Sequence, residues 1–413
     1  MREPNISVGI DIGSTKIITC VGKFEDGNID IIGMGESPNQ GIRKGVIVDI
    51  EETVSGITSS ILEAERMAGC QIQGAVVGIS GPFIENELSK GVIAISNPVG
   101  EITPEDVARV TEAAKAIPTK PNREVLHVIP QNYIIDGNEV IKDPLGMTGI
   151  RLEVISNIVT ASSNAVKSLI KSVDQANIGV EELVFSPLAT AKLLLSKRQL
   201  EMGVMLIDIG ASATSYAAYE DGEITICGVI PIGSTHITND IAIGLRTNLE
   251  LADLIKLKYG YALPDKVDEK ESIDLSKLDK HEEGEVKIKY VSEIIEARLS
   301  EIFSLIQENL RKHDCNEALP AGIVLTGGGS KIMGIVEMTK EKMRLPAKIG
   351  APVLEITGLI DKVGDPVYST CIGLMLWGKD KAREPNRMNF NFDVRGVGTV
   401  VDKVKTIFKN FIP

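Results

Sequence analysis

The sequence predicts an α/β protein with two similar lobes that enclose a cleft. Three observations lead to this prediction. One pattern of strands and turns occurs at residues 8–31 and again at residues 204–226. A glycine-rich turn follows the apolar stretch from Ile323 to Leu325. The length and composition suit a globular protein of two lobes. The repeat matters most, because internal similarity indicates duplicated structural units.

Length and composition restrict the class of protein. The chain has 413 residues, of which 43% are hydrophobic and 24% are charged, as in ordinary globular proteins. Its net charge of -13 argues against a nucleic-acid binder, which would present a basic face. The five cysteines are widely separated, which favours reduced thiols in a cytosolic protein over disulfides or zinc ligands. We expect neither a signal peptide nor a membrane-spanning stretch of about 20 apolar residues.

The repeat consists of two matched three-strand units. In each unit an apolar strand ends in Asp-Ile-Gly, at Asp11 or at Asp208, and a turn rich in serine and threonine follows. A second apolar strand then leads through a Glu-Asp-Gly turn, at residues 25–27 or 220–222, into a third strand. Each unit is therefore predicted to be an antiparallel meander with its aspartate at the tip of the first hairpin.

The matched hairpin tips predict two phosphate-binding turns that close on a polyphosphate from opposite lobes. Backbone N–H groups in such turns form an anion-binding concavity, and hydroxyl groups add donors. Asp11 and Asp208 are expected to hold Mg²⁺ through its water molecules, because this ion usually keeps several waters and bridges phosphates. The residues expected to face the phosphates are Gly13, Ser14, Thr15 and Lys16 in the first turn and Gly210, Ser212 and Thr214 in the second.

A third glycine-rich element, GIVLTGGGSKIMG at residues 322–334, connects a predicted strand with an amphipathic segment. Because glycine has no side chain, this turn would let a flat nucleoside lie against the backbone. The residues expected to approach the nucleoside are Gly327, Gly328, Gly329 and Ser330. Three such turns in this order are more specific than any one of them.

The three turns resemble the two phosphate loops and the adenosine loop of the actin and heat-shock-chaperone superfamily. Longer stretches resemble the FtsA family of bacterial cell-division proteins more closely: HVIPQNYIIDG at 127–137, IKDPLGMTGIRLEV at 141–154, GIRKGVIVDIE at 41–51, PAGIVLTGG at 320–328, IGAPVLEITGLID at 349–361 and PVYSTCIGLMLWGK at 366–379. The resemblance implies an actin-like two-lobe fold, with a cleft between duplicated βββαβα-type domains that binds ATP and Mg²⁺.

An inserted subdomain with the order β-α-β-β is predicted within the first lobe. The expected strands are GVIAISN, EVLHVIPQNYIID and RLEVISNIVTAS. The expected helix starts with Thr103 as its N-cap and Pro104 in its first position. The resemblance implies that this subdomain contacts the next subunit of an actin-like filament.

A mainly helical subdomain is predicted in the second lobe. Apolar residues recur at helical spacing from Val291 to Leu310, whereas the highly charged residues 264–287 predict a solvated excursion. The resemblance places in this subdomain the docking surface for the C-terminal peptide of FtsZ, the tubulin-like division protein. Arg298 is the candidate contact, because its planar fork can hold a carboxylate, although an arginine on a helix can also be merely solvated. Asp253 and Lys256 stand where the superfamily brings polar side chains to the base and ribose, although such residues are usually surface charges.

Residues 399–413, TVVDKVKTIFKNFIP, predict an amphipathic helix that begins with a capping box at Thr399 and Asp402. A helix packed on the body of the protein is one interpretation. An interfacial anchor is favoured, because lysines opposite an apolar face suit anionic headgroups, and the resemblance implies the same. The predicted membrane-binding residues are Val400, Val401, Lys403, Val404, Ile407, Phe408, Lys409, Phe411 and Ile412.

The second phosphate loop departs from the family pattern, which reads DIGGGT followed by an acid. Here residues 208–216 read DIGASATSY, so Ala211 and Ser212 replace glycines. Ala213 stands where threonine is usual, and Ser215 stands where the acid is usual. We still expect nucleotide binding, because backbone donors survive if the turn keeps its shape. No residue can be named as a catalytic base, so the chain is expected to be at most a weak ATPase.

The predicted function is that of a filament-forming adaptor that tethers FtsZ to the cytoplasmic face of the membrane at the division site. The expected partners are FtsZ, further copies of this chain, the lipid surface and other division proteins. Two alternatives remain. An ATP-dependent kinase of small molecules such as sugars would need a base beside a substrate pocket. A pilus-assembly ATP-binding adaptor normally lacks both HVIPQ and an amphipathic tail.

The predicted boundaries divide the chain as follows: residues 1–84 and 163–200 form the first core subdomain, 85–162 the insertion, 201–234 and 316–378 the second core subdomain, 235–315 the helical subdomain, 379–398 a linker, and 399–413 the terminal helix.

Overall fold

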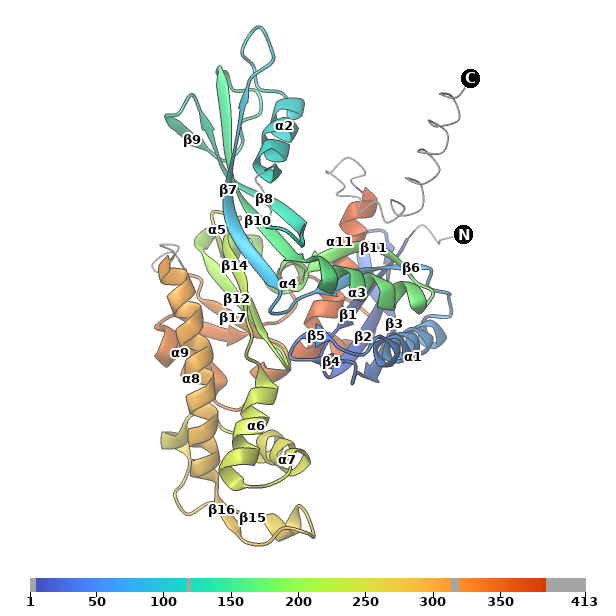
Figure 1. Ribbon diagram of the computed structural model, residues 1–413, viewed down its shortest axis with the longest axis vertical. Coiled ribbons are helices and arrows are strands. Elements are labelled where there is room, and N and C mark those ends of the chain that lie inside the picture. The colour runs from blue at the N-terminus through green and yellow to red at the C-terminus, as the bar shows by residue number, and fades with distance from the viewer. Residues whose placement is uncertain (1–4, 117–119, 313–318, 384–413) are drawn as a thin grey trace, which may run out of the picture.

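The computed structural model describes residues 5–116, 120–312 and 319–383. Two five-stranded sheets form the cores of the two lobes, and a four-stranded sheet lies beside them (Figure 1). The strand order is β11-β6-β1-β2-β3 in the first sheet and β14-β13-β12-β17-β18 in the second. In both, an antiparallel meander is followed by two parallel strands, so the second half of the chain repeats the topology of the first. This confirms the predicted duplication.

The bounds of the strands are as follows. The first sheet consists of β1 (Ile6–Ile12), β2 (Lys16–Glu25), β3 (Asn28–Pro38), β6 (Gly74–Ile79) and β11 (Gly179–Phe185). The second consists of β12 (Val204–Ile209), β13 (Thr214–Glu220), β14 (Glu223–Ile230), β17 (Ile323–Thr326) and β18 (Ala347–Ile349). A small hairpin, β4 (Ile42–Arg43) and β5 (Val46–Ile47), follows β3.

The two predicted Glu-Asp-Gly turns have the same backbone conformation. Asp26 and Gly27 have φ values of 50° and 90°, and Asp221 and Gly222 have values of 52° and 83°. Positive φ at both central residues is the type I′ turn, whose twist matches that of the flanking strands. The repeated Asp-Gly pair therefore joins the second and third strands of each meander in the same way.

The helices of the first lobe are α1 (Ile50–Ala68), α3 (Ser163–Gln175), α4 (Ser186–Leu194) and α11 (Ser369–Arg383). Helix α11 follows the strands of the second lobe but packs on the first sheet. A Cβ atom on Gly9 would lie 2.5 Å from the carbonyl oxygen of Cys371, and one on Gly22 would lie 2.3 Å from the sulfur of Met375. Glycines at these two positions therefore allow the helix to approach β1 and β2.

The position of α11 corrects two predicted boundaries. Residues 369–378 belong to the core of the first lobe and not to that of the second. The predicted linker starts at residue 379, but α11 continues to Arg383. The prediction was wrong because a local pattern does not show that the chain crosses back between the lobes. The rest of the predicted linker and the helix at 399–413 lie outside the described residues.

The inserted subdomain contains β7 (Ile84–Ala94), α2 (Pro104–Lys115), β8 (Arg123–Ile135), β9 (Glu139–Ile141) and β10 (Arg151–Ser162). Its sheet has the order β7-β10-β8-β9 and carries α2 on one face (Figure 1). The predicted elements are present, and β9 is an additional short strand. Helix α2 starts as predicted, with Thr103 as its N-cap and Pro104 as its first residue, and Thr103 forms a capping box with Asp106 in the first turn.

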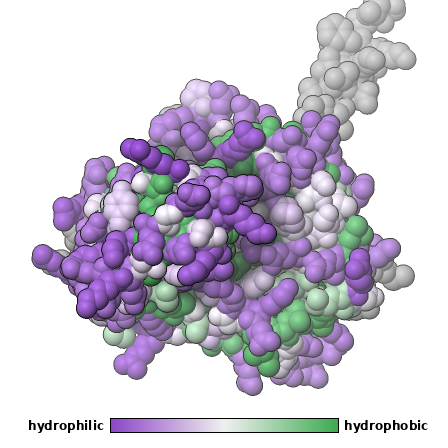
Figure 2. Space-filling model, turned by 90° about the horizontal axis from the view of Figure 1, so that it is seen from below, coloured by the Kyte–Doolittle hydropathy of each residue, from purple (hydrophilic) through white to green (hydrophobic). Residues whose placement is uncertain are grey.

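The second lobe carries α6 (Ser234–Leu245), α7 (Leu249–Tyr259) and the long α8 (Ile288–Lys312), with α9 (Ile335–Met343) beside α8. The charged residues 264–287 are not simply a solvated excursion. They form the hairpin of β15 (Ser272–Asp274) and β16 (Glu285–Lys287), and Ile273 and Leu275 are buried in the core of this lobe. The end of the molecule that carries this hairpin presents a largely hydrophilic surface (Figure 2).

The remaining short helices are α5 (Lys197–Met202), which precedes β12, and α10 (Ile360–Val363), which precedes α11. Within the described ranges, no helix combines the length and the apolar character that crossing a bilayer requires.

Candidate functional site

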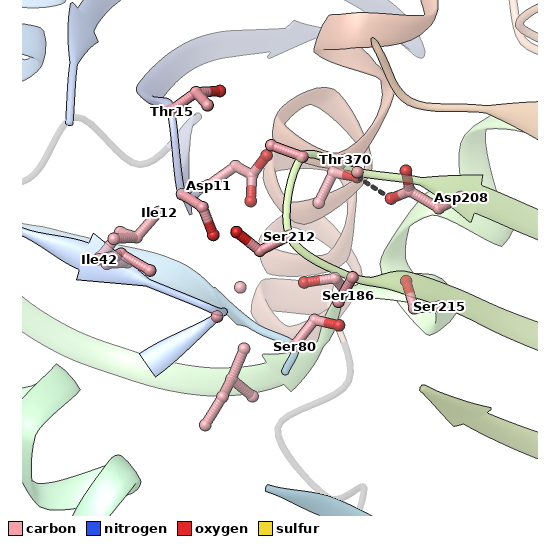
Figure 3. Close-up of a pocket in the computed structure, with 18 of the residues that line it drawn as sticks. Asp11, Ile12, Thr15, Ile42, Ser80, Ser186, Asp208, Ser212, Ser215 and Thr370 are labelled. Carbon is pink, nitrogen blue, oxygen red and sulfur yellow. Dashed lines mark hydrogen bonds between the residues drawn. The ribbon is translucent and has the colours of Figure 1, made fainter. Parts of the chain in front are cut away.

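A cavity of about 530 Å³ lies between the two lobes. Its walls include the turns that follow β1, β12 and β17, which are the three turns that the sequence singled out. Figure 3 shows side chains of the first two turns, among them Thr15 and Ser212, on either side of the cavity. The predicted residues that line it are Asp11, Gly13, Ser14, Thr15, Lys16, Asp208, Gly210, Ser212, Gly327 and Gly328.

The turns after β1 and β12 have the same geometry. The N–H of Gly13 donates to the carbonyl of Lys16 at 3.0 Å, and the N–H of Gly210 donates to that of Ala213, also at 3.0 Å. A Cβ atom would lie 2.8 Å from the Lys16 carbonyl oxygen if placed on Gly13, and 2.9 Å from the Ala213 carbonyl oxygen if placed on Gly210. The alanines of the second loop therefore leave the shape of the turn intact, as nucleotide binding by its backbone requires.

Two carboxyl groups from equivalent strand ends lie in the cavity. Burial, and in addition the negative charge of Asp208, raise the pKa of Asp11 to about 7. Burial also raises the pKa of Asp208 to about 6, although the hydroxyl of Thr370 donates to this carboxyl at 3.2 Å (Figure 3). Both carboxyl groups would be stabilised in their charged form by a cation between them. An oxygen-only set of carboxyl and hydroxyl groups suits Mg²⁺.

Three helices begin at the cavity. Ser162, Ser186 and Ser234, at the first residues or N-caps of α3, α4 and α6, line it. None of these helices has a hydrogen bond to its N-cap side chain or an acidic residue in its first turn. Helices α1, α2 and α7 have both. The first N–H groups of α3 and α6 already donate to nearby carbonyls, that of Ser163 to Asn122 and those of Ser234 and Thr235 to Gly210 and Ala211. What favours an anion at the three ends is therefore the positive end of each helix dipole. The cavity therefore suits a polyanion accompanied by a divalent cation.

Several hydroxyl groups of the cavity were missed by the sequence analysis. Ser80 follows β6 and Ser186 follows β11, and the carboxyl ends of these parallel strands meet at the same edge as that of β1. The order of the strands would have identified both, because ligands in such sheets bind at the carboxyl ends of parallel strands. The other polar residues that were missed are Ser162, Asn164, Ser168, Ser215, Ser234 and Thr370.

Three predicted residues support the turns and do not line the cavity. The hydroxyl of Thr214 donates to the carbonyl of Ile232 at 2.8 Å. Gly329 packs against Ile209, where a Cβ atom would lie 2.4 Å from a methyl carbon. The hydroxyl of Ser330 donates to the carbonyl of Gly327 at 2.7 Å.

Asp253 and Lys256 are also absent from the cavity wall. The ammonium of Lys256 donates to a carboxyl oxygen of Asp253 and to the hydroxyl of Thr238, each at 2.6 Å. The side chain of Lys256 is only 9% exposed. These contacts hold α7 against α6, so Asp253 and Lys256 have a structural role here.

Lys16 is held at the cavity wall by an acid. Its ammonium lies 2.5 Å from a carboxyl oxygen of Glu36, and the hydroxyl of Tyr368 donates to the other oxygen at 2.7 Å. Partial burial opposes the ionisation of Glu36, but these two contacts lower its pKa. The contacts join β2, β3 and the turn before α11.

Arg298, the predicted peptide contact, lies on α8 and is already paired. Its guanidinium donates to both carboxyl oxygens of Asp240, at 2.6 and 2.9 Å, and also contacts Glu301. The side chain is 24% exposed. An acidic ligand would have to compete with these carboxylates.

Solved structures with the same fold include the PilM–PilN type IV pilus biogenesis complex and MreB5 of Spiroplasma citri bound to ADP. The first has a TM-score of 0.66 at 16% identity and covers 90% of this chain and 98% of that chain. The second has a TM-score of 0.53 at 14% identity and covers 93% and 99%. At these identities the likeness shows the fold alone, which is actin-like.

Sequence comparisons are more specific. The family model for cell division protein FtsA matches residues 205–373, and the model for the SHS2 domain inserted in FtsA matches residues 81–160. Curated relatives named cell division protein FtsA include that of Pseudomonas aeruginosa, 39% identical over 94% of this chain and 93% of the relative. That of Borreliella burgdorferi is 38% identical over 98% of both, and that of Escherichia coli K12 is 35% identical over 92% and 91%. The chain therefore belongs to the FtsA family of bacterial cell-division proteins.

Proposed function

We propose that this actin-like cell-division protein binds ATP, assembles into filaments and tethers FtsZ to the cytoplasmic face of the membrane through its C-terminal segment. The observation that carries the proposal is the pair of turns with one geometry, at Gly13 and Gly210, on opposite sides of a single cavity. Backbone donors on both sides and two carboxyl groups between them are what a nucleotide polyphosphate with Mg²⁺ requires.

In this proposal each turn has its own task. The N–H groups of Gly13 and Gly210 close the turns, those of residues 14–16 and 211–213 hold the phosphates, and Asp11 and Asp208 orient the waters of Mg²⁺. Gly327, with a φ of 81°, and Gly328 form the wall for the nucleoside. A Cβ atom on Gly328 would have only one neighbour within 4 Å, at 3.9 Å, so there is room for a ligand at this point. The bound Mg²⁺ would supply positive charge to the phosphates.

We propose that ATP acts mainly as a conformational ligand and that turnover is slow. Among the described residues that line the cavity, the ionisable side chains are Asp11, Lys16 and Asp208. The two aspartates are assigned to the cation, and Lys16 is paired with Glu36. None is therefore free to activate a water molecule. Since a ligand shifts a conformational equilibrium only through its preference for one state, ATP would favour the closed cleft and assembly.

The membrane part of the proposal rests on residues 399–413, which lie outside the described residues. Their predicted apolar arc and lysines suit an anionic lipid surface. One such helix would bind reversibly, and a filament that presents many would bind firmly, because linked weak sites add by avidity. Family membership supports a place at the division site. The kinase and pilus-adaptor alternatives are not favoured, because the curated relatives are FtsA proteins.

Calorimetric titration with ATP, with and without Mg²⁺, tests the nucleotide site. We expect Mg²⁺-dependent binding to the intact chain and a loss of at least tenfold in affinity, about 1.4 kcal/mol, for Asp11→Asn. Asp26→Asn is the matched control, because it makes the same change at the tip of a hairpin outside the cavity, at a positive φ that asparagine tolerates. An Asp11→Asn variant that binds Mg·ATP as the intact chain does would contradict the assignment.

A further inference from the structure

The HVIPQ segment, residues 127–131, has no role in the proposed nucleotide site. It lies in β8, at the base of the inserted subdomain, where the sheet of this subdomain approaches both lobes (Figure 1). Side chains at its two ends make polar contacts with different lobes. Together these contacts bridge the two lobes.

His127 attaches the subdomain to the first lobe. Its Nε2 atom accepts a hydrogen bond from the backbone N–H of Phe185 at 2.9 Å. Phe185 is the last residue of β11, and Ser186, which follows it, lines the cavity. The imidazole also meets the ring of Trp377 on α11 edge-on, with the ring centroids 6.0 Å apart. This attachment therefore reaches the wall of the nucleotide site and the last helix of the described chain.

Gln131 and Asn157 attach the subdomain to the second lobe. The side-chain amide of Gln131 donates to the carbonyls of Ile224 and Thr225, at 2.7 and 2.9 Å. The amide of Asn157, on β10, donates to the carbonyl of Ile224 at 2.7 Å, and Asn157 is fully buried. Both acceptors belong to β14, the edge strand of the second sheet.

Irregular pairing of both strands creates this contact. Along β8, Pro130 pairs with Ser156 and Asn132 pairs with Ile155, so Gln131 has no partner on β10. Along β14, the residues before and after Thr225 pair with consecutive residues of β13, so Thr225 also has no partner. A β-bulge redirects a side chain or a backbone group from the ladder. Here two bulges meet, and the amide displaced from one strand satisfies the carbonyls of the other.

We propose that Gln131 and Asn157 clamp the inserted subdomain to the second lobe, so that movement between the lobes turns the subdomain relative to the first lobe. The chain joins the subdomain to the first lobe at both of its ends, before β7 and after β10. A change in the angle between the lobes must therefore either break the hydrogen bonds to β14 or carry the subdomain along. Three hydrogen bonds from two side-chain amides, one of them on the buried Asn157, favour the second course.

Through the clamp, movement between the lobes at the nucleotide site would displace the far end of the molecule. The distal loops and β9 lie at the tip of the inserted subdomain, far from the cavity (Figure 1). A small rotation at the base of a rigid sheet becomes a larger displacement at its tip. That ATP drives this movement rests on the proposed function, whereas the clamp itself does not.

Distance measurements between spin labels test the inference. One label is placed on β9 through Val140→Cys, and the other on α1 through Leu62→Cys, both at exposed positions. Cys70 and Cys315 are replaced by serine, while the buried Cys20, Cys227 and Cys371 are retained. The variant is Gln131→Glu, which keeps the shape of the side chain but replaces the donor by an acceptor. The matched control is Asn132→Ala, a change of the next residue on the same strand.

Without nucleotide, we expect a narrow distance distribution for the intact chain and the control, and a broad one for Gln131→Glu. Saturating Mg·ATP should shift the distance in the intact chain and the control but not in Gln131→Glu. The clamp is overturned if, without nucleotide, the distance distribution of Gln131→Glu is as narrow as that of the control. The coupling is overturned if Mg·ATP binds to the intact chain, as measured by calorimetry, and the distance does not change. If Mg·ATP does not bind, the proposed function fails, and the nucleotide-free widths still decide whether the clamp exists.

Discussion

Asp11 and Asp208 occupy equivalent positions near the ends of β1 and β12, and they influence each other's ionisation across the cavity. Burial and then the charge of Asp208 raise the pKa of Asp11 to about 7, and burial raises that of Asp208 to about 6. The duplication of the fold thus brings two acids together at the junction of the lobes. Without a cation, each raises the cost of charging the other.

The first prediction concerns the effect of pH on stability. Both aspartates have pKa values above 3.8 in the folded chain, so the folded state binds more protons than the unfolded state between about pH 4 and 7. Their contribution to the free energy of unfolding therefore falls as the pH rises through this window. Asp11→Asn with Asp208→Asn should remove that part of the dependence and raise stability at pH 7.5. Urea unfolding without Mg²⁺ at pH 5.5 and 7.5 measures it, and an unchanged pH slope in the double variant would refute it.

The second prediction concerns Gly327. Its φ is 81°, and a Cβ atom there would lie 2.1 Å from a carboxyl oxygen of Asp208. We expect Gly327→Ala to displace Asp208, to abolish Mg²⁺-dependent ATP binding, and to cost about 1–3 kcal/mol of stability. Gly222→Ala is the matched control, because Gly222 has a φ of 83° and open space around the added atom. For this control we expect urea unfolding to show a loss of stability and calorimetry to show unchanged ATP binding. Equal ATP binding by the two variants would count against the model of the site.

The third prediction concerns Arg298 and its competitor Asp240. If Arg298 holds a carboxylate of the FtsZ peptide, Asp240→Asn should strengthen peptide binding severalfold, because it removes an internal acid from the guanidinium. Arg298→Ala should weaken binding roughly tenfold, about 1.4 kcal/mol. Lys289→Ala is the control for lost positive charge, since Lys289 lies on the same helix and pairs with Glu269. Fluorescence anisotropy of a labelled peptide gives the affinities. Equal losses for Arg298→Ala and Lys289→Ala would point to general electrostatics.

The fourth prediction concerns the C-terminal segment. The intact chain should sediment with anionic liposomes, and a chain that ends at Gly398 should stay in the supernatant. Mg·ATP should increase sedimentation of the intact chain, because assembly presents many helices to one surface. Changing Lys403 and Lys409 to glutamate reverses charge without shortening the chain and should also release the protein. If the truncated chain sediments equally well, the segment is not the anchor.

The repeated elements were predictable because the residue types at their turns favour the backbone conformations that these turns require. The Asp-Gly pairs of both meanders adopt positive φ, a conformation that these residue types favour. The turns at Gly13 and Gly210 followed from the same reasoning. Here the local sequence determines the local geometry, and duplication makes the signal recognisable.

Other features depend on packing that no local pattern reveals. The return of α11 to the first sheet depends on Gly9 and Gly22, whose importance appears only when the helix is in place. Thr214 was predicted to face the phosphates because it closely follows Gly210 in the sequence. As the first residue of β13, it instead donates its hydroxyl to the carbonyl of Ile232. Ser186 is a single serine after a strand, and the order of the strands brings it to the cavity.

The meeting of the two bulges also blocks strand pairing with another molecule at this part of the β14 edge. An edge strand with unpaired carbonyls can accept a strand from another molecule and start aggregation. At Ile224 and Thr225 the outward carbonyls of β14 are occupied by side-chain amides, which cannot extend the ladder further. The same two side chains that we propose to transmit movement thus also keep this edge closed to strands from other chains.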